Sequence, residues 1–285
     1  MRNDVALEDG VYGCRALIHG GWDRFMTGYL IGNGVVELVL NQATGWEGRD
    51  LSFLTELPGL ELFEIFDFSI KDITPIHSLH RLRRLGITTY CSTEIDFSAF
   101  PRLRSCGLEW RPKATSLFDC TTLKELFVNG YSGKVFSPFA ALFNLESLAI
   151  LNSPIANLHQ LGALRRLRSL RLANLKRLTS LAGIEGLATL EELEIHTCRA
   201  IRSIEEIGSL PGLRRLFLNN DGDIESLKPL EKLNGLEWVL FYESTNICDG
   251  DLSPLLYQKN LSRVSFRNRR HYSHRREDFG AAYTR

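Results

Sequence analysis

The sequence contains no run of about 18 apolar residues, so no segment is expected to cross a membrane as a helix. Net charge is also missing, because 34 Lys and Arg balance 34 Asp and Glu, as in an ordinary soluble globular protein. The first residues, MRNDVALEDG, do not have the basic-then-apolar layout of a secretory signal peptide. These absences favour a cytoplasmic protein.

Motifs for catalysis are missing as well. The GNG at 32–34 has neither the third glycine nor the strand–helix context of a dinucleotide fingerprint. The chain shows no nucleophile elbow, no phosphate loop and no paired carboxylates on a defined scaffold. The pairs His77/His80 and His271/His274 have no cysteine or carboxylate set at the spacing of a four-ligand zinc site. We therefore expect no enzyme, no cofactor and no metal.

Leucine is abundant, and its spacing is informative. In LRRLRSLRLANLKRLTSLAGIEGL, residues 164–187, leucine mostly returns every third residue, but Leu170 and Leu172 are two apart. On a helix these leucines would spread over more than half of the circumference, too wide for one apolar stripe. A step of two is the period of a strand, where alternate side chains share a face. The stretch therefore reads as one turn of a repeating unit.

The unit recurs along the chain as apolar-x-x-Leu-x-x-apolar-x-apolar. Ten copies are in register at intervals of 20 to 25 residues, and a weaker eleventh copy is anchored at Val35. The leucines at the second apolar position are Leu60, Leu82, Leu103, Leu123, Leu145, Leu167, Leu190, Leu213, Leu236 and Leu261.

This pattern resembles the leucine-rich repeat family, and LEELEIHTCRAIRSI, residues 190–204, is the copy most similar to the family motif. The resemblance implies an α/β right-handed solenoid with a parallel sheet on the concave face and short turns or 3₁₀ segments on the convex face. It covers about eleven coils over residues 35–266. Secreted members of the family often close the solenoid with cysteine clusters, which are missing here. We read at least three of the six cysteines, Cys106, Cys120 and Cys198, as buried reduced thiols.

One position departs from the family, where asparagines would form a hydrogen-bonded ladder between coils. In this sequence we expect only Cys198, Asp221 and the serines Ser153 and Ser244 to take that role. The remaining coils carry other residues there: Ala43, Phe68, Tyr90, Arg111, Tyr131, Leu175 and Arg269.

Two segments lie outside the repeat. Residues 1–34 are expected to cap the first coil, with the glycine-rich IGNG at 31–34 as a hairpin turn. Residues 267–285 form a basic tail with too few apolar residues for another coil. The tail is expected either to fold across the last coil as a cap or to be mobile.

The resemblance implies a non-catalytic module that binds a partner protein, as an adaptor or inhibitor. Aromatic residues beside arginine at outward strand positions have the composition of an interface hot spot. We expect such a site at Phe217, Trp238, Leu240 and Tyr242, flanked by Arg171, Arg215, Glu194 and His196, with Phe127 and Phe66 as weaker contributors.

Two alternatives stay open. A stand-alone repeat chain also suits an immunity protein that neutralises a toxin. The tail could contact nucleic acid through Arg267, Arg269, Arg270, Arg275 and Arg276 with Tyr272, although Glu277 and Asp278 follow at once.

Overall fold

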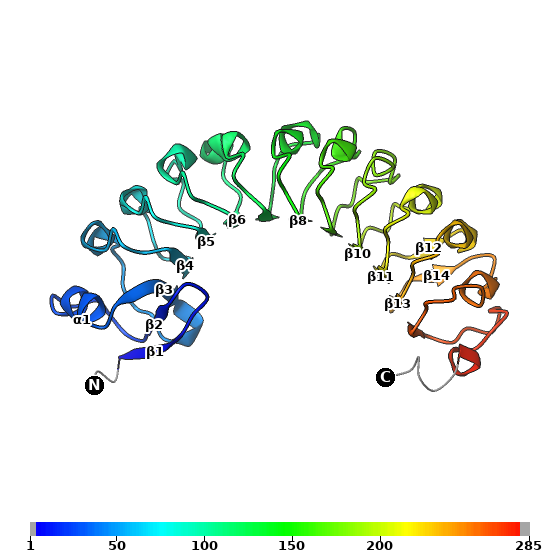
Figure 1. The fold of residues 1–285 in the computed structure, drawn as a ribbon, viewed down its shortest axis with the longest axis horizontal. Coiled ribbons are helices and arrows are strands. Elements are labelled where there is room, and N and C mark those ends of the chain that lie inside the picture. The colour runs from blue at the N-terminus through cyan, green and yellow to red at the C-terminus, as the bar shows by residue number, and fades with distance from the viewer. Residues whose placement is uncertain (1–3, 280–285) are drawn as a thin grey trace. The chain divides into compact units, whose positions relative to one another are not determined.

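The computed structural model describes residues 4–279. They divide into two units, an N-terminal unit (Met1–Val128) and a C-terminal unit (Asn129–Arg285). Each unit is a stack of coils with one short strand per coil on the concave side and a short turn or helix opposite (Figure 1). This is the α/β repeat architecture that the sequence predicts. Within the described part of the chain, no helix has both the length and the apolar character that a membrane crossing requires.

The N-terminal unit contains a sheet in which the strands follow chain order. The first two strands pair antiparallel, and every later pair in the order β2-β3-β4-β5-β6 is parallel. The strands are β1 (Val5–Asp9), β2 (Cys14–Ile18), β3 (Val35–Asn41), β4 (Leu62–Phe66), β5 (Arg84–Thr88) and β6 (Ser105–Glu109), and β7 (Glu125–Asn129) contains the boundary between the units.

The C-terminal unit repeats the arrangement with parallel strands. Its main strands are β8 (Ser147–Leu151), β9 (Ser169–Ala173), β10 (Glu192–His196), β11 (Arg215–Asn219), β13 (Trp238–Tyr242) and β15 (Arg263–Phe266). A second, two-stranded parallel sheet lies beside them, formed by β12 (Asp223–Ile224) and β14 (Asn246–Ile247).

The core confirms the register of the repeat. All ten anchor leucines are at most 4% exposed, and most strands alternate buried with partly exposed residues, as in β9, where Leu170 and Leu172 point inward. The opposite side of most coils holds a 3₁₀ turn, because 20 to 25 residues per coil leave no room for a long helix, whereas the coil between β9 and β10 has only simple turns there. These turns are Gln42–Thr44, Ser52–Glu56, Thr74–Ser78, Phe97–Ala99, Pro112–Asp119, Ser137–Ala141, Leu161–Ala163, Glu205–Ser209, Lys228–Lys232 and Ser253–Leu255.

The ladder position follows the expectation at Cys198 and Asp221. The Asp221 Oδ1 accepts a hydrogen bond from the Cys198 amide at 2.8 Å, and the Asp221 amide donates to the Thr245 Oγ1 at 3.1 Å. Ser244 also joins two coils, since its Oγ donates to the Asn220 Oδ1 at 2.7 Å, but the buried ladder residue of its coil is Thr245. Likewise Asp67 and Thr89, rather than Phe68 and Tyr90, are the inward residues of their coils.

The shift has a conformational cause. Where the ladder residue comes two after the strand, the residue between is often in the left-handed region, as at Asn152, Asn174 and Asn220. Asp67 and Thr89 follow β4 and β5 directly, with no such residue between. The left-handed asparagines form a second, more exposed amide row, in which the Asn152 Nδ2 donates to the Asn129 Oδ1 at 2.7 Å and the Asn174 Nδ2 donates to the Asn152 Oδ1.

The N-terminal segment contains a hairpin, but IGNG is not its turn. The hairpin joins β1 to β2 through Gly10–Gly13, where the Gly10 amide donates to the Gly13 carbonyl at 2.8 Å. IGNG instead ends helix α1 (Met26–Gly32), and Gly34 adopts φ +66° just beyond it. The expected hairpin turn was wrong here, because the segment Met26–Gly32 before Asn33 is long enough for two helical turns.

The described part of the tail folds across the last coil. The Tyr272 and Phe279 rings lie 5.8 and 5.9 Å from the Phe266 ring, and the Tyr272 hydroxyl accepts a hydrogen bond from the Ile247 amide at 3.1 Å. A last 3₁₀ turn spans Arg276–Phe279. The tail residues 280–285 and the first three residues of the N-terminal cap lie outside the described part.

All six cysteines lie in the described part of the chain, and all are free thiols. Burial raises the pKa of Cys106, Cys120 and Cys198, as expected for inert core thiols.

Candidate partner-binding surface

The outward side chains of the C-terminal unit form rows that cross neighbouring strands. Strand pairing places Glu192, Arg215, Trp238 and Arg263 side by side in one row. The next row runs Arg171, Glu194, Phe217, Leu240 and Ser265, and the third runs Ala173, His196, Asn219 and Tyr242. The eight residues expected at this site from the sequence are therefore neighbours on one face.

Trp238 is at the centre of the aromatic part of this face. The guanidinium carbons of Arg215 and Arg263 lie 5.9 and 5.3 Å from its ring centroid, within the range of cation–π attraction. The Phe217 ring meets it edge-on at 6.5 Å. Since Trp238 is only partly covered, the group presents an aromatic surface held in place by charged neighbours. We call Phe217, Trp238, Tyr242, Arg215 and Arg263 the aromatic–arginine patch.

Two of the expected residues differ in exposure. The Tyr242 side chain is 37% exposed at the end of β13, so a partner can reach it. Leu240 points outward but is only 7% exposed. It therefore packs beneath the patch and leaves little area for a partner to contact.

A charged group borders the patch at Glu194. This carboxylate accepts from the Arg171 Nε at 2.5 Å and lies 3.0 Å from the His196 Nε2. The hydrogen bond from His196 and the charge of Arg171, against partial desolvation, lower the pKa of Glu194 to about 2. Arg215 is fixed in the same way, since its Nε donates to the Glu192 Oε2 at 2.6 Å. The side chains around the patch are thus held in defined positions before any partner arrives.

The N-terminal unit has a hollow on its strand-lined face. Gly86 and Gly107 are paired at outward positions of β5 and β6, so two neighbouring strands lack side chains there. A cavity of about 370 Å³ lies over them, bordered by Phe66 and Phe127, which are 39% and 42% exposed. Glu64 lies beside Gly86 and accepts from the Arg84 Nε at 2.7 Å. The sequence indicated the two phenylalanines but not the glycine floor between them.

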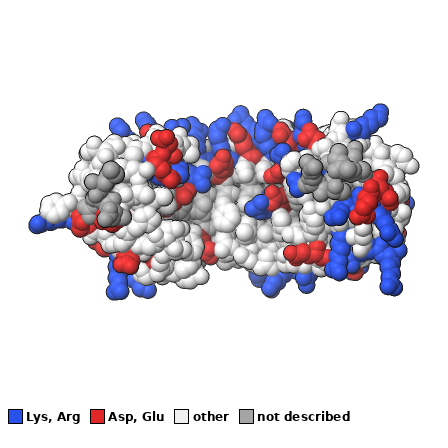
Figure 2. Space-filling view, turned by 90° about the horizontal axis from the view of Figure 1, so that it is seen from below, with Lys and Arg blue, Asp and Glu red and all other residues white. Residues whose placement is uncertain are grey.

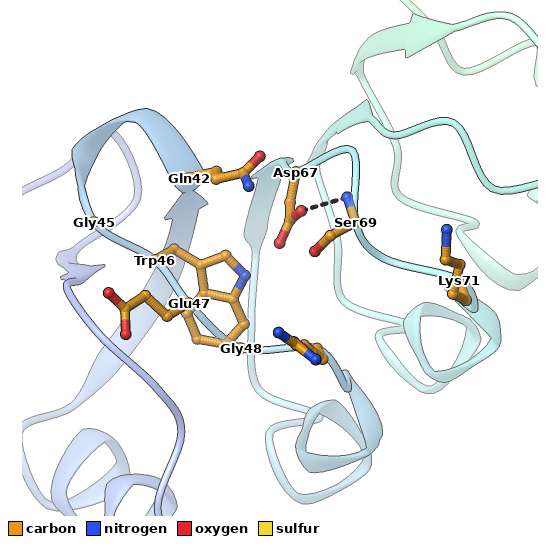
Figure 3. A pocket seen from close by; sticks show the side chains of 9 residues that line it. Gln42, Gly45, Trp46, Glu47, Gly48, Asp67, Ser69 and Lys71 are labelled. Carbon is orange, nitrogen blue, oxygen red and sulfur yellow. Dashed lines mark hydrogen bonds between the residues drawn. The ribbon is translucent and has the colours of Figure 1, made fainter.

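Another cavity of the N-terminal unit lies at the ends of β3 and β4 (Figure 3), with a volume of about 820 Å³. Asp67 and Trp46 line it, and the Asp67 Oδ1 accepts from the Ser69 amide at 2.7 Å. Arg49 and Lys71 oppose Glu47 and Asp67 in charge, so the lining is polar and mixed.

Basic side chains gather over the last coils on the face shown in Figure 2. In the last coil and the tail, Arg267 and Arg270 are exposed. Arg269 is different, because its Nη2 donates to the Thr245 carbonyl at 3.0 Å and closes the end of a coil. Tyr272 is likewise used inside the cap, which removes two members of the set expected to contact nucleic acid.

The histidine pairs make local hydrogen bonds. The His77 Nε2 accepts from the Asp96 amide at 3.0 Å, the His80 Nδ1 lies 3.0 Å from the Ala99 carbonyl, and the His271 Nε2 lies 2.9 Å from the Ile247 carbonyl. The His274 Nδ1 lies 2.8 Å from the Ser273 hydroxyl. Among residues 4–279, no group of three or more potential metal ligands comes together.

Comparison with known proteins bears on the fold. No protein-family model and no curated protein sequence matches the chain. Among solved structures, internalin InlF of Listeria monocytogenes is similar with a TM-score of 0.60 and 21% identity, over 92% of this chain and 82% of that one. Internalin C2 of the same species has a TM-score of 0.50 and 21% identity, over 75% of this chain and 84% of that one. Together with the registered repeats and the buried anchor leucines, this shared architecture shows that the chain has the leucine-rich repeat fold.

Proposed function

We propose that the chain is a non-catalytic binding module that docks a partner protein on the strand-lined face of its C-terminal unit. The observation that carries the proposal is the aromatic–arginine patch, in which Arg215 and Arg263 both lie over the ring of the partly exposed Trp238. Tryptophan, tyrosine and arginine dominate the binding energy of protein interfaces, because they bury large areas and make polar contacts at the same time.

The patch also limits the chemistry of the partner. Arg215 is paired with Glu192, whereas Arg263 lies on β15, the last strand in the order of the sheet. A partner that places an apolar side chain against Trp238 and a carboxylate near Arg263 would satisfy both. We therefore expect the partner to present an acidic segment with an apolar side chain at its centre.

Affinity measurements with matched variants test the location. The Trp238→Ala and Tyr242→Ala changes should each weaken binding of the isolated partner by roughly 2 kcal/mol or more, about 30-fold in Kd. Tyr257→Ala is the control, because Tyr257 is 72% exposed beyond the 3₁₀ turn Ser253–Leu255 and away from the strands. Equal affinity of the double variant and the Tyr257 control, with both folded by circular dichroism, would show that the patch is not the docking site.

The N-terminal unit is tested by filling its hollow. A Cβ added at Gly107 meets no atom within 4 Å, so Gly107→Leu should fold normally and occupy the space between Phe66 and Phe127. Weaker partner binding by this variant would place the hollow in the interface. Unchanged binding would confine the interface to the C-terminal unit.

Nucleic-acid contact is the less supported alternative, because Arg269 and Tyr272 hold the cap together. It requires retention on a polyanion column that weakens steeply with salt and is lost without residues 268–285. We also propose a reducing, cytoplasmic setting, which the six free thiols support.

A further inference from the structure

Arg111 is a buried arginine in a ladder position. It is 4% exposed, and it replaces the amide that would usually join two coils. Its Nη1 donates to the Cys91 carbonyl at 3.0 Å and to the Cys91 Sγ at 3.1 Å. Its Nη2 donates to the Thr89 carbonyl at 3.2 Å and to the Thr89 Oγ1 at 3.0 Å. None of these four acceptors is a carboxylate, so the hydrogen bonds leave the positive charge uncompensated.

A buried cation without a counter-charge destabilises the folded state. The absence of water also strengthens its electrostatic attraction to any anion nearby. Among the four acceptor atoms only the Cys91 sulfur can become an anion. The Thr89 hydroxyl adds a second contact to it, at 3.2 Å from the Sγ. The geometry therefore stabilises Cys91 as a thiolate, the form of cysteine that acts as a nucleophile.

The direction of the pKa shift at Cys91 agrees with this geometry, and it differs from the direction at Cys248. Burial by itself would raise the pKa of Cys91, but the hydrogen bond from Thr89 and the charge and hydrogen bond of Arg111 outweigh it, and the pKa is lowered. The pKa of Cys248 is raised, chiefly by desolvation, although that residue is exposed.

A cavity of about 350 Å³ opens beside the thiol, within the size range of small-molecule sites. Tyr90, Trp110 and Pro112 supply flat walls, and the charged residues in the lining are Arg111, Lys113 and Glu109. The Arg111 Nε is buried and has no acceptor among the described residues. The cavity thus combines a net positive lining, an unused buried donor and a nucleophile, which suits a small ligand carrying carboxylates.

We propose that Cys91 is a modification site that exchanges with anionic low-molecular-weight disulfides of the glutathione class. The Cys91 thiol first releases its proton to solvent, with Arg111 as counter-ion. The thiolate then attacks one sulfur of the disulfide, so that a bond from the Cys91 Sγ forms while the disulfide bond breaks. The departing thiolate takes a proton from water, and a thiol reductant reverses the exchange.

The test combines two readouts on the full chain, both resolved for each cysteine by peptide mass spectrometry. In the first, iodoacetamide labelling is followed against pH, and the midpoint at Cys91 should lie below the midpoint at Cys248. This comparison does not depend on how easily the reagent reaches each site. In the second, glutathione disulfide should give an adduct at Cys91 that dithiothreitol removes, with less adduct at Cys248.

Variants connect both readouts to the geometry. Arg111→Gln should raise the midpoint at Cys91 and slow its labelling at pH 7 about threefold for each unit that the pKa rises, since the loss of thiolate outweighs its higher nucleophilicity. Thr89→Val, which removes only the hydroxyl, keeps the test usable if Arg111→Gln does not fold, and it should raise the midpoint by a smaller amount. A Cys91 midpoint at or above that of Cys248, or an adduct found mainly on Cys248, would overturn the proposal.

Discussion

Asp221 gives the sharpest prediction, because its carboxyl has no exposed surface. Burial raises its pKa from 3.8 to about 7, and the hydrogen bond from the Cys198 amide offsets this only in part. The Asp221 Oδ2 is buried and makes no hydrogen bond among the described residues. An ionised carboxylate at this place is therefore a cost to the folded state.

Proton linkage gives the direction in which folding stability changes with pH. The folded pKa lies above the unfolded one, so between pH 4 and pH 7 the folded state binds more protons than the unfolded state, and stability falls as the pH rises through this window. A shift of roughly three units at 1.36 kcal/mol each gives a loss of about 4 kcal/mol at most. Asp221→Asn removes the ionisation but keeps an oxygen for the Cys198 amide.

Urea unfolding of both chains at several pH values measures this effect. At pH 4.5 the asparagine variant should be more stable by only about 1 kcal/mol, and at pH 8 by a few kcal/mol, up to the limit above. Taking the difference between the chains cancels the titration of all other groups. A difference that stays constant from pH 4.5 to pH 8 would refute the reasoning about burial.

Three further predictions concern the C-terminal unit. Leu193→Ala should destabilise by about 2 to 5 kcal/mol because Leu193 is fully buried, whereas Arg168→Ala should cost less than about 0.5 kcal/mol since its pair with Glu191 is exposed; urea unfolding distinguishes them. Thr197→Asn should raise the melting temperature, because a β-branched residue at φ 56° is strained by about 1 kcal/mol and asparagine tolerates this conformation; an unchanged or lower melting temperature would contradict it. Glu194→Gln should lower stability at pH 7, and the deficit should shrink as the pH falls from 4.5 towards 2, because the folded pKa of about 2 lies below the unfolded value; a deficit independent of pH would count against the Arg171 and His196 contacts.

Much of the fold was predictable because leucine spacing reports directly on burial. Each anchor leucine is inside the core, and the alternation in the strands assigns the outward residues of both units. The exact ladder residue was not predictable at Asp67, Thr89 and Thr245, because the number of residues between the strand and the inward side chain varies from none at Asp67 and Thr89 to two at Thr245. The backbone conformation just after a strand does not change the spacing of the apolar residues, so that spacing cannot predict it.

The candidate site was predictable in composition but not in detail. Phe217, Trp238 and Tyr242 followed from the register, whereas the part played by Arg263 depended on side-chain direction. The hollow over Gly86 and Gly107 could have been noticed, since glycine at two paired outward positions is unusual in strands. The contact between Cys91 and Arg111 joins residues 20 apart in the sequence, and neither residue fits a known motif.

The row of asparagines has a consequence for the length of the molecule. Asn152 lies between Asn129 and Asn174 at intervals close to one repeat, and its amide bonds to an asparagine in the coil before and to another in the coil after. Removal of one whole repeat between them would bring Asn174 opposite Asn129 and recreate an equivalent bond. Gene duplication or deletion in whole repeats can therefore lengthen or shorten this part of the protein without any new interaction having to evolve.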